Sequence, residues 1–293
     1  MVDLDVEERV DYTQYTNRQL MVVPLVVLVV ALLVIAGWYV TTGAPASPDV
    51  EFTGGVELQV ENGSEERIRE AYDRPITSIR TVSERGGGSG GHIVTFQSGP
   101  NVPSVNATEL TDTAEANGFD VQSVQETSPS FGASTQRLAF IGIGAAFVGM
   151  AIMIFVLFRS PVPCLAVVLS AFSDIVVPVA IMNLVGIKLS LGTVAALLML
   201  IGYSVDSDIL LTNQVLRRRG AFYESTYRAM RTGVTMTITS FAAMTVMAIV
   251  ATLFGIDLLA AVGTVLALGL ATDLMNTYLF NVGLLRWYKG VET

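Results

Sequence analysis

The chain has 293 residues, of which 52% are hydrophobic and only 15% are charged, whereas soluble proteins average about 25% charged residues. This composition argues against a water-soluble globule and assigns most of the chain to lipid. The net charge of −9 gives no electrostatic basis for binding nucleic acid, so we expect no nucleic-acid partner.

The negative charge is concentrated in one polar stretch. Residues 41–135 hold 14 acidic residues and 5 arginines, so this stretch alone carries −9. Lys188 and Lys289 are the only lysines, and arginine supplies the other 15 of the 17 basic residues. An acidic, lysine-poor exterior stays hydrated in concentrated salt, where the Debye length falls to about 3 Å at 1 M. The pattern indicates either a halophile's surface or simply an acidic solvated face.

Six apolar segments are long enough to cross a bilayer, which takes about 20 mostly apolar residues. The first follows the polar residues 1–20 and is too long for a cleavable signal peptide, so we expect it to remain as an anchor. It is mainly Val and Leu, and we expect it at the periphery. The other five, within residues 136–286, are rich in small residues that let membrane helices pack closely as a bundle. The predicted helices are residues 21–40, 137–158, 162–183, 189–213, 233–254 and 258–285.

The polar residues 41–135 predict a small folded domain between the first and second helices. Apolar alternation and helical patterns follow one another in the order β-α-β-β-α-β, which is typical of a ferredoxin-like fold. A glycine-rich run at residues 86–91 lacks the Lys-Ser/Thr ending of a phosphate-binding loop, so we interpret it as a flexible connection. The expected strands are near 56–60, 76–82, 92–96 and 119–125, and the expected helices are 64–72 and 106–117.

The positions of the basic residues predict the orientation, because short cytoplasmic loops carry an excess of Lys and Arg. Outside the long polar stretch 41–135, the basic residues of the short loops and the termini fall on the side that holds both termini, and the short loops of the other side have little beyond Lys188. We therefore expect a multi-pass protein of the cell membrane with cytoplasmic termini, a cytoplasmic tail at residues 287–293, and residues 41–135 extracytoplasmic. The basic residues on the expected cytoplasmic side are Arg9, Arg18, Arg159, Arg217, Arg218, Arg219, Arg228, Arg231, Arg286 and Lys289.

Four acidic residues lie within the predicted membrane helices: Asp174, Asp206, Asp208 and Asp273. An ionisable residue at the bilayer centre costs at least about 2.5–3.5 kcal/mol on insertion scales, so such residues indicate function by default. Residues two apart on a helix project about 200° apart, so Asp206 and Asp208 must face different partners.

Polar residues recur at helical spacing on three of the predicted helices. If these stripes face one another, they form a hydrated seam that could carry protons within the bundle. The alternative is that they form hydrogen bonds that only fix helix packing. The stripes are Ser204, Asp208 and Thr212; Thr232, Thr235 and Thr239; and Asp273, Thr277 and Asn281.

Other site chemistries lack candidates. His92 is the only histidine and Cys164 the only cysteine, which leaves no Ser-His-Asp arrangement, no intrachain disulfide and no cluster at metal-ligand spacing. We expect His92 to be structural or solvated and Cys164 to be a packed small apolar residue. We therefore expect neither an enzyme nor a bound cofactor or metal.

Several motifs resemble one known family. Residues 201–208, Ile-Gly-Tyr-Ser-Val-Asp-Ser-Asp, resemble the helix 4 signature of SecF, the smaller half of the SecDF complex that assists the protein-translocation channel. Residues 51–55, Glu-Phe-Thr-Gly-Gly, resemble the start of its outer domain, and Ser173-Asp174 resembles the His-Asp pair of its helix 3. Arg231 and the Ile-Thr-Ser of residues 238–240 resemble its helix 5. These motifs occur in the family's order over most of the chain.

The resemblance implies an RND-superfamily half of the archaeal, halophilic type, with six transmembrane helices and an extracytoplasmic ferredoxin-like domain. It implies a non-enzymatic subunit that acts with SecD beside a SecYE-type channel on a translocating polypeptide. In bacterial relatives a helix 4 Asp and a helix 5 Arg couple this to proton flow; here those positions are Ser207 and Thr235. The candidates for proton coupling are Asp174, Asp206, Asp208, Asp273, Arg231, Ser204, Tyr203 and Asn213.

Two other functions compete with this interpretation. An RND-type exporter half for lipids or hydrophobic small molecules has the same helix pattern, but exporters usually carry a larger porter region and two six-helix repeats in one chain. A membrane-anchored sensor or adhesion module would use the acidic outer domain, and its intramembrane Asp residues would then lack a purpose.

Overall fold

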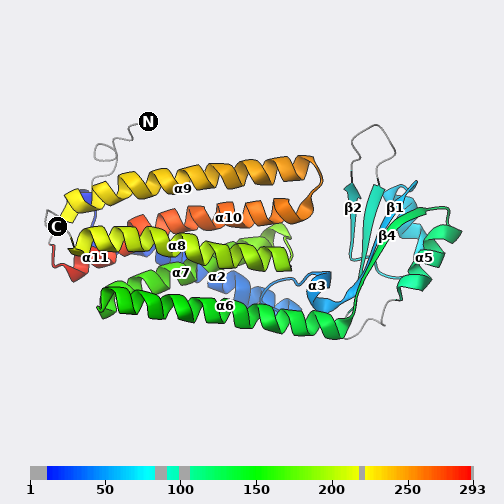
Figure 1. Cartoon of the computed structure of the whole chain (residues 1–293), viewed down its shortest axis with the longest axis horizontal. Coiled ribbons are helices and arrows are strands. Elements are labelled where there is room, and N and C mark those ends of the chain that lie inside the picture. Colours follow the sequence, from blue (N-terminus) through cyan, green and yellow to red (C-terminus); the bar gives the residue numbers. More distant parts are fainter. Residues whose placement is uncertain (1–11, 83–90, 99–105, 218–221, 292–293) are drawn as a thin grey trace.

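The computed structural model describes residues 12–82, 91–98, 106–217 and 222–291. The molecule is elongated, with a bundle of long helices at one end and a small sheet domain at the other (Figure 1). Within the described residues, six helical segments are long and apolar enough to cross a membrane, which confirms the predicted fold class. They are α2 (Asn17–Thr42), α6 (Pro129–Phe158), α7 (Pro161–Val185), α8 (Leu191–Arg217), α9 (Phe222–Leu253) and the continuous run of α10 (Asp257–Met275), η2 (Asn276–Asn281) and α11 (Val282–Tyr288). The predicted glycine-rich loop and Arg9, Arg218 and Arg219 fall wholly or largely outside the described residues.

Local sequence sets where these helices begin and end. Thr16 caps α2 in a reciprocal arrangement with Gln19, in which each side chain accepts from the other residue's backbone N–H. Ser128 caps α6 and Pro129 occupies its first position, where a missing N–H costs nothing. α6 therefore starts eight residues before the predicted span, since its first turns lie outside the apolar run and pack against the short helix α3 (Val50–Thr53).

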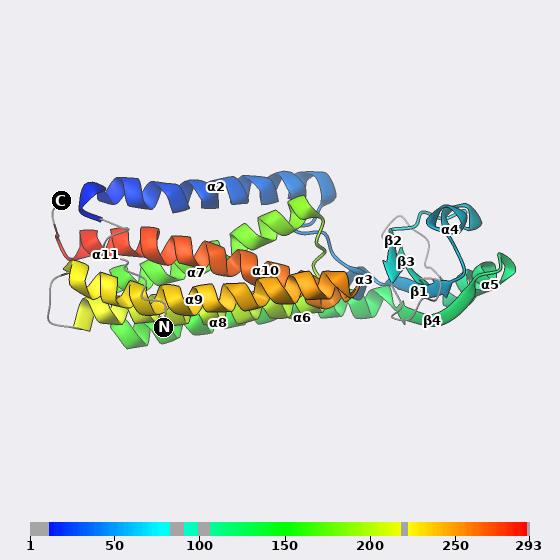
Figure 2. The same cartoon turned by 90° about the horizontal axis from the view of Figure 1, so that it is seen from above.

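The bundle has an inner and an outer set of helices. α7, α8 and α10 have the larger buried fractions, whereas α2, α6 and α9 expose most of their apolar side chains. Seen from above, α2 lies along one side of the bundle, and α6, α8 and α9 lie on the opposite side (Figure 2). The first helix is thus peripheral as expected, but α6 and α9 are more exposed still, which the small-residue content of those helices did not predict.

The domain between α2 and α6, called the outer domain here because it lies beyond the end of the bundle, is a four-stranded antiparallel sheet with two helices on one face. The strands have the order β2-β3-β1-β4, which is the ferredoxin-like arrangement that the sequence predicted. Val56, Leu58 and Val60 of β1 point to the helices and form the core with Ile68 and Leu110, while the alternate residues of β1 face the other way. The elements are β1 (Gly55–Glu61), α4 (Glu65–Ala71), β2 (Ser78–Val82), β3 (Gly91–Gln97), α5 (Ala107–Ala116) and β4 (Asp120–Thr127).

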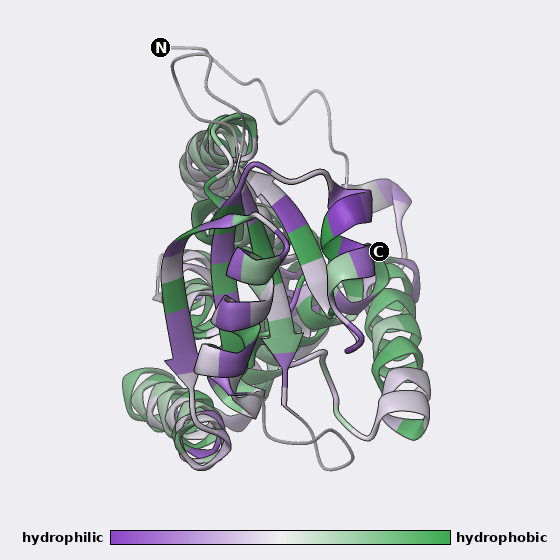
Figure 3. Cartoon of the chain, turned by 90° about the vertical axis from the view of Figure 1, so that its right-hand side faces the viewer, coloured by the Kyte–Doolittle hydropathy of each residue, from purple (hydrophilic) through white to green (hydrophobic). Residues whose placement is uncertain are grey.

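The helix-free face of the sheet is turned toward the bundle (Figure 1). Its side chains are mostly polar, because pairing places Ser78, Thr95, Glu57 and Gln125 in one row across the four strands. Viewed from the sheet end, the domain carries hydrophilic residues interspersed with hydrophobic ones, whereas the bundle helices behind it are mostly hydrophobic (Figure 3). The chain thus separates a water-facing unit from a lipid-facing unit.

The segment between α2 and β1 joins the two units tightly. Leu189, in the connection between α7 and α8, exchanges backbone hydrogen bonds with this segment: its N–H donates to Ser47 and its carbonyl accepts from Asp49. Glu51 Oε2 accepts from the Leu191 N–H at 2.6 Å, so a carboxylate meets the first turn of α8, where the helix dipole favours negative charge. The domain is therefore held to the bundle by backbone pairing as well as by side chains.

At the opposite end of the bundle, Arg286 of α11 is fully buried. Its guanidinium donates to Asn17 Oδ1 and to the backbone carbonyls of Tyr12 and Tyr15. The Tyr12 hydroxyl in turn donates to the Tyr278 carbonyl at 2.8 Å. This network ties the short helix η1 (Tyr12–Gln14) and the start of α2 to the last helix.

Candidate functional site

Three carboxyl groups from three inner helices lie together inside the bundle. Asp174 of α7, Asp208 of α8 and Asp273 of α10 are each 99–100% buried. Hydroxyl and amide groups of the same helices connect them, so the bundle contains one polar cluster surrounded by apolar side chains. We call these residues and their hydrogen-bond partners the carboxyl cluster.

Asp174 has a donor for each of its oxygens. Ser204 Oγ of α8 donates to Oδ2 at 2.5 Å, and Asn276 Nδ2 donates to Oδ1 at 2.7 Å. Both donors are themselves buried. Asp174 therefore links α7 to α8 and to the segment that follows α10.

Asp273 is bound mainly by Ser207, the position where the resemblance places the family's helix 4 Asp. Ser207 Oγ lies 2.9 Å from Oδ1 and 3.1 Å from Oδ2 of Asp273. Thr277, one turn further along, lies 3.3 Å from Oδ1. At this position α8 therefore supplies a hydroxyl group and α10 supplies the acid that it meets.

Asp208 faces the other side of the cluster. Its Oδ1 accepts from Thr277 Oγ1 at 2.8 Å and from Asn281 Nδ2 at 2.5 Å. Ser170 of α7 also faces this carboxyl group. Among the described residues, no Arg, Lys or His side chain is a hydrogen-bond or ion-pair partner of the three acids, so the cluster is held by neutral donors.

A π-helical turn, η2, supplies several of these donors. It spans Asn276–Asn281 and interrupts the helix directly after α10. Asn276 and Asn281 are five residues apart, and the wider turn lets both side chains reach the cluster, one at Asp174 and the other at Asp208. Such turns occur frequently at functional sites. The predicted stripe followed i+4 steps from Asp273, which find Thr277 and Asn281 and pass over Asn276 at i+3.

The structure brings only some of the predicted site residues together. Asp174, Asp208, Asp273 and Ser204 belong to the carboxyl cluster, as do Thr277 and Asn281 of the third predicted stripe. The other predicted residues lie on the outside of the bundle, away from the cluster. These are Tyr203, Asp206 and Asn213 of α8 and Arg231 of α9.

The predicted stripe on α9 also points outward, which corrects the idea that all three stripes meet. Thr232, Thr235 and Thr239 are exposed, and each hydroxyl bonds the carbonyl four residues earlier. The buried face of α9 carries Gly233 and Thr237 instead. The stripe of Thr232, Thr235 and Thr239 was predicted from helical spacing alone, and spacing does not determine which face of a helix packs inward.

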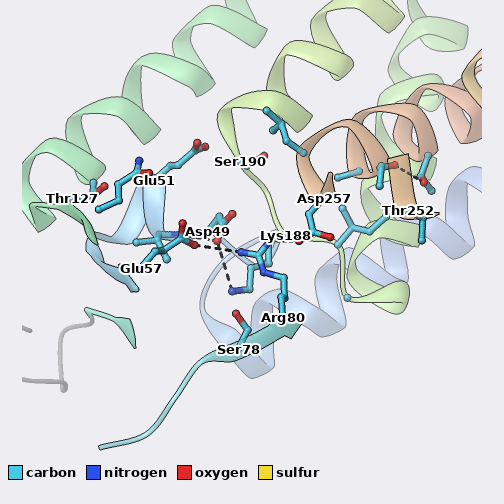
Figure 4. Close-up of a pocket in the computed structure, with 18 residues that line it drawn as sticks. Asp49, Glu51, Glu57, Ser78, Arg80, Thr127, Lys188, Ser190, Thr252 and Asp257 are labelled. Atoms are coloured by element: carbon cyan, nitrogen blue, oxygen red, sulfur yellow. Dashed lines mark hydrogen bonds and ion pairs between the residues drawn. The ribbon is translucent and has the colours of Figure 1, made fainter. Parts of the chain in front are cut away.

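A second feature is a cleft of about 680 Å³ between the sheet and the outer end of the bundle (Figure 4). The helix-free face of the sheet forms one wall, and the connection between α7 and α8 and the first two turns of α10 contribute to the other. Arg80 of β2 lies between Glu57 and Asp257 and pairs with both, at 3.3 and 3.0 Å. Lys188 pairs with Asp49 at 3.7 Å. The acids that line the cleft are therefore largely engaged in contacts that hold the two units together.

No group of three or more His, Cys, Asp and Glu side chains within the described ranges is arranged to hold a metal ion. Cys164 is a free thiol, and His92 is the second residue of β3, where its ring nitrogen lies 3.3 Å from the Thr81 hydroxyl. Neither residue joins the carboxyl cluster. The chemistry that the cluster can perform is the binding and transfer of protons or small cations among carboxyl, hydroxyl and amide groups.

The chain is similar to proteins of one family. The family model described as protein export membrane protein SecD/SecF, C-terminal, matches residues 106–291. The chain is 63% identical over 290 residues to the protein-export membrane protein SecF of Haloferax volcanii, covering 99% of this chain and 98% of that protein. It is 60% identical over 291 residues to SecF of Haloquadratum walsbyi, with 99% and 98% coverage, and 38% identical over 276 residues to SecF of Pyrococcus furiosus, with 92% and 90% coverage.

A solved structure has the same fold. The crystal structure of SecDF, a translocon-associated membrane protein from Thermus thermophilus, matches with a TM-score of 0.65 at 19% sequence identity. The match covers 93% of this chain but only 38% of the SecDF chain. Together with the full-length sequence similarity, the family match over residues 106–291 shows that this chain belongs to the SecF family of protein-export membrane proteins.

Proposed function

We propose that the chain is the SecF-type accessory subunit of a protein-export machinery and works together with a second, SecD-type six-helix subunit. The relatives that match it over nearly their whole length are named protein-export membrane proteins. The Thermus SecDF chain is much longer, and this chain corresponds to 38% of it. A single chain of this size therefore represents one part of the larger assembly.

The observation that carries the proposal is the exposed polar face of the bundle. Asp206 lies near the middle of α8, and its side chain is exposed, as are those of Tyr203 and Asn213 on the same helix. A charged residue facing lipid at that depth costs at least about 2.5–3.5 kcal/mol. A partner subunit that covers this face would remove the cost, whereas an isolated chain would bear it.

The outer domain would act on the extracytoplasmic side. With cytoplasmic termini, the sheet domain stands on the side where exported polypeptide leaves a SecYE-type channel, and the polar face of the sheet looks toward the membrane surface. The Gln, Ser and Thr side chains of that face offer donors and acceptors to an extended polypeptide of any sequence. The domain would contact the translocating polypeptide, while the bundle holds the partner.

The carboxyl cluster would couple this work to protons. Buried carboxyl groups that face a bundle interior are the usual elements of membrane proton relays. Here the relay would use Asp174, Asp208 and Asp273 with neutral donors between them. Arg231 and Asp206 would act elsewhere, because both lie on the outer face of the bundle. The family assignment does not favour the alternative of an exporter for lipids or small molecules.

Co-purification tests the partnership. Asp206→Leu removes the charge from the exposed face, and we expect it to reduce recovery of the SecD-type subunit while leaving the stability of the isolated chain unchanged or higher. Ile152→Ser is the matched control, because Ile152 is 60% exposed on α6. Recovery of the partner in normal yield with Asp206→Leu would contradict the proposed interface, and failure of the wild-type chain to recover any such subunit would contradict the proposed function.

A further inference from the structure

Asp208 and Asn281 are joined in a way that leaves two buried oxygens without partners. Asn281 Nδ2 donates to Asp208 Oδ1. Oδ2 of Asp208 and Oδ1 of Asn281 are both buried and have no hydrogen-bond partner. Both residues are 0% exposed, so water does not satisfy these atoms at the protein surface. A buried acceptor without a donor costs about 1–3 kcal/mol, so two on adjacent side chains call for a physical cause.

The other two acids of the carboxyl cluster differ from Asp208. Asp174 accepts one hydrogen bond on each oxygen, from Ser204 and from Asn276. Asp273 has Ser207 Oγ within hydrogen-bond distance of both of its oxygens. Every oxygen of these two acids has a donor group within reach, although the single Ser207 proton can be given to only one oxygen of Asp273 at a time. Asp208 is the acid of the cluster that has a buried oxygen with no donor within hydrogen-bond distance.

One proton on Oδ2 of Asp208 satisfies both orphan oxygens. A protonated carboxyl group is a donor as well as an acceptor, and a carboxamide carries a donor and an acceptor side by side. Asn281 can then donate Nδ2–H to Oδ1 while its own Oδ1 accepts from Oδ2–H, which closes a ring of two hydrogen bonds. We propose that Asp208 is the proton-binding residue of this chain and that Asn281 is the positioning residue that selects its protonated form.

The surroundings of Asp208 agree with a neutral carboxyl group. The titratable groups that face it are Asp273 from α10, Asp174 from α7 and Tyr278 from η2, and none of them contributes positive charge. A negative charge on Asp208 would be opposed by the loss of hydration and by any negative charge on these neighbours. When the proton leaves, the O–H electron pair stays on Oδ2, and the two acceptor oxygens face each other without a hydrogen between them. Release of the proton would therefore push Asn281, and with it η2, away from α8.

Two alternatives to a proton on Oδ2 of Asp208 can be distinguished from it by experiment. The Ser170 hydroxyl could donate to Oδ2, but Asn281 Oδ1 would remain without a partner. A monovalent cation between the two oxygens would satisfy both of them, with Asp208 ionised. The proposal deepens the proton-coupled function given above, but its test measures the protonation of one side chain and does not depend on export.

Infrared difference spectroscopy of the purified full chain provides the test, since the C=O stretch of a protonated carboxylic acid is resolved from that of a carboxylate. At neutral pH we expect a protonated-carboxyl band from Asp208 that shifts in D2O. Asp208→Asn should abolish this band, whereas Asp174→Asn and Asp273→Asn should retain it. Absence of the band from the wild-type chain, or its survival in Asp208→Asn, would overturn the assignment.

The role of Asn281 needs its own variants. Asn281→Leu removes both hydrogen bonds to Asp208, and we expect the band to move to higher frequency because its C=O loses a donor. Asn276→Leu, which alters the neighbouring acid, is the control and should leave the band in place. If Ser170→Ala shifts the band and Asn281→Leu does not, Ser170 is the partner and the proposal is wrong. Loss of the band when sodium replaces choline at constant ionic strength would show a cation at this position, which would also overturn it.

A stability measurement covers the case in which Asn281→Leu does not fold. A carboxamide offers the same donor and acceptor as a neutral carboxyl group, so Asp208→Asn should preserve the paired ring and leave the thermal midpoint unchanged. Asp208→Leu should lower it, because Asn281 and Thr277 would lose their acceptor. A large loss of stability in Asp208→Asn would indicate an ionised Asp208 and would refute the proposal. Either result can be obtained whether or not the SecD-type subunit co-purifies, so failure here is distinct from failure of the proposed function.

Discussion

Arg80 of β2 and Asp257 of α10 form an ion pair, with 3.0 Å between Nη1 and Oδ2, that joins the outer sheet to the helix carrying Asp273. Asp257 is the first residue of α10, and Asp273 lies 16 residues further along the same helix. At 1.5 Å per residue these two acids are about 24 Å apart. One helix therefore contacts the outer domain at one end and the carboxyl cluster at the other.

The Arg80–Asp257 pair should stabilise the joint only slightly. The two side chains are 36% and 48% exposed, and pairs of this kind contribute about 0.2–1 kcal/mol. Arg80→Gln and Asp257→Asn are combined in a double-mutant cycle, and thermal unfolding should give a coupling free energy in that range. The coupling should disappear at high salt, because exposed charges are screened. Arg74 and Glu109 form a comparable pair within the outer domain and serve as the control. A salt-independent coupling of several kcal/mol would contradict this expectation.

Gly132 of α6 should be intolerant of a side chain. A Cβ at this position would lie 2.8 Å from both the carbonyl carbon and the carbonyl oxygen of Phe52, where α6 crosses α3. Backbone cannot yield as a flexible side chain can, so Gly132→Ala should destabilise the chain by about 1–3 kcal/mol, measured by thermal unfolding in detergent.

Gly142 of the same helix provides the control for this substitution. Nothing lies within 4 Å of its Cβ position. Gly142→Ala should leave stability unchanged or raise it by at most about 1 kcal/mol, because alanine favours the helix. Equal effects of the two substitutions would show that the close crossing of α6 and α3 is not under steric constraint.

Arg286 should matter for stability although it forms no ion pair among the described residues. It is buried and donates to Asn17 Oδ1 and two backbone carbonyls, so Arg286→Met would leave these acceptors without a donor. The free energy of unfolding should fall by about 1–3 kcal/mol for each acceptor left without a donor, and removal of a buried charge should partly offset this loss. Lys289→Met, at an exposed position of the same end, should change stability by no more than about 0.5 kcal/mol. Similar melting of both variants would rule out a structural role for Arg286.

The tertiary structure corrected the predicted site by showing which face of each helix is buried. Helical spacing found Asp208, Thr277 and Asn281, because each lies on the buried face of its helix. The same reasoning failed for Thr235 and Thr239, which follow the same periodicity on the outer face of α9. Asn276 was not predicted because the stripe was followed in i+4 steps from Asp273, and Asn276 lies at i+3.

The sequence by itself determined the six apolar helices, the order of strands and helices in the outer domain, and the presence of buried acids. These are properties of short segments: about 20 apolar residues cross a bilayer, and an alternating pattern makes a half-buried strand wherever it occurs. Only the tertiary structure decided how each helix is rotated about its axis. Rotation depends on packing against neighbours distant in the chain, and it placed Asp206 outside the bundle and Asp208, two residues later, against Asn281.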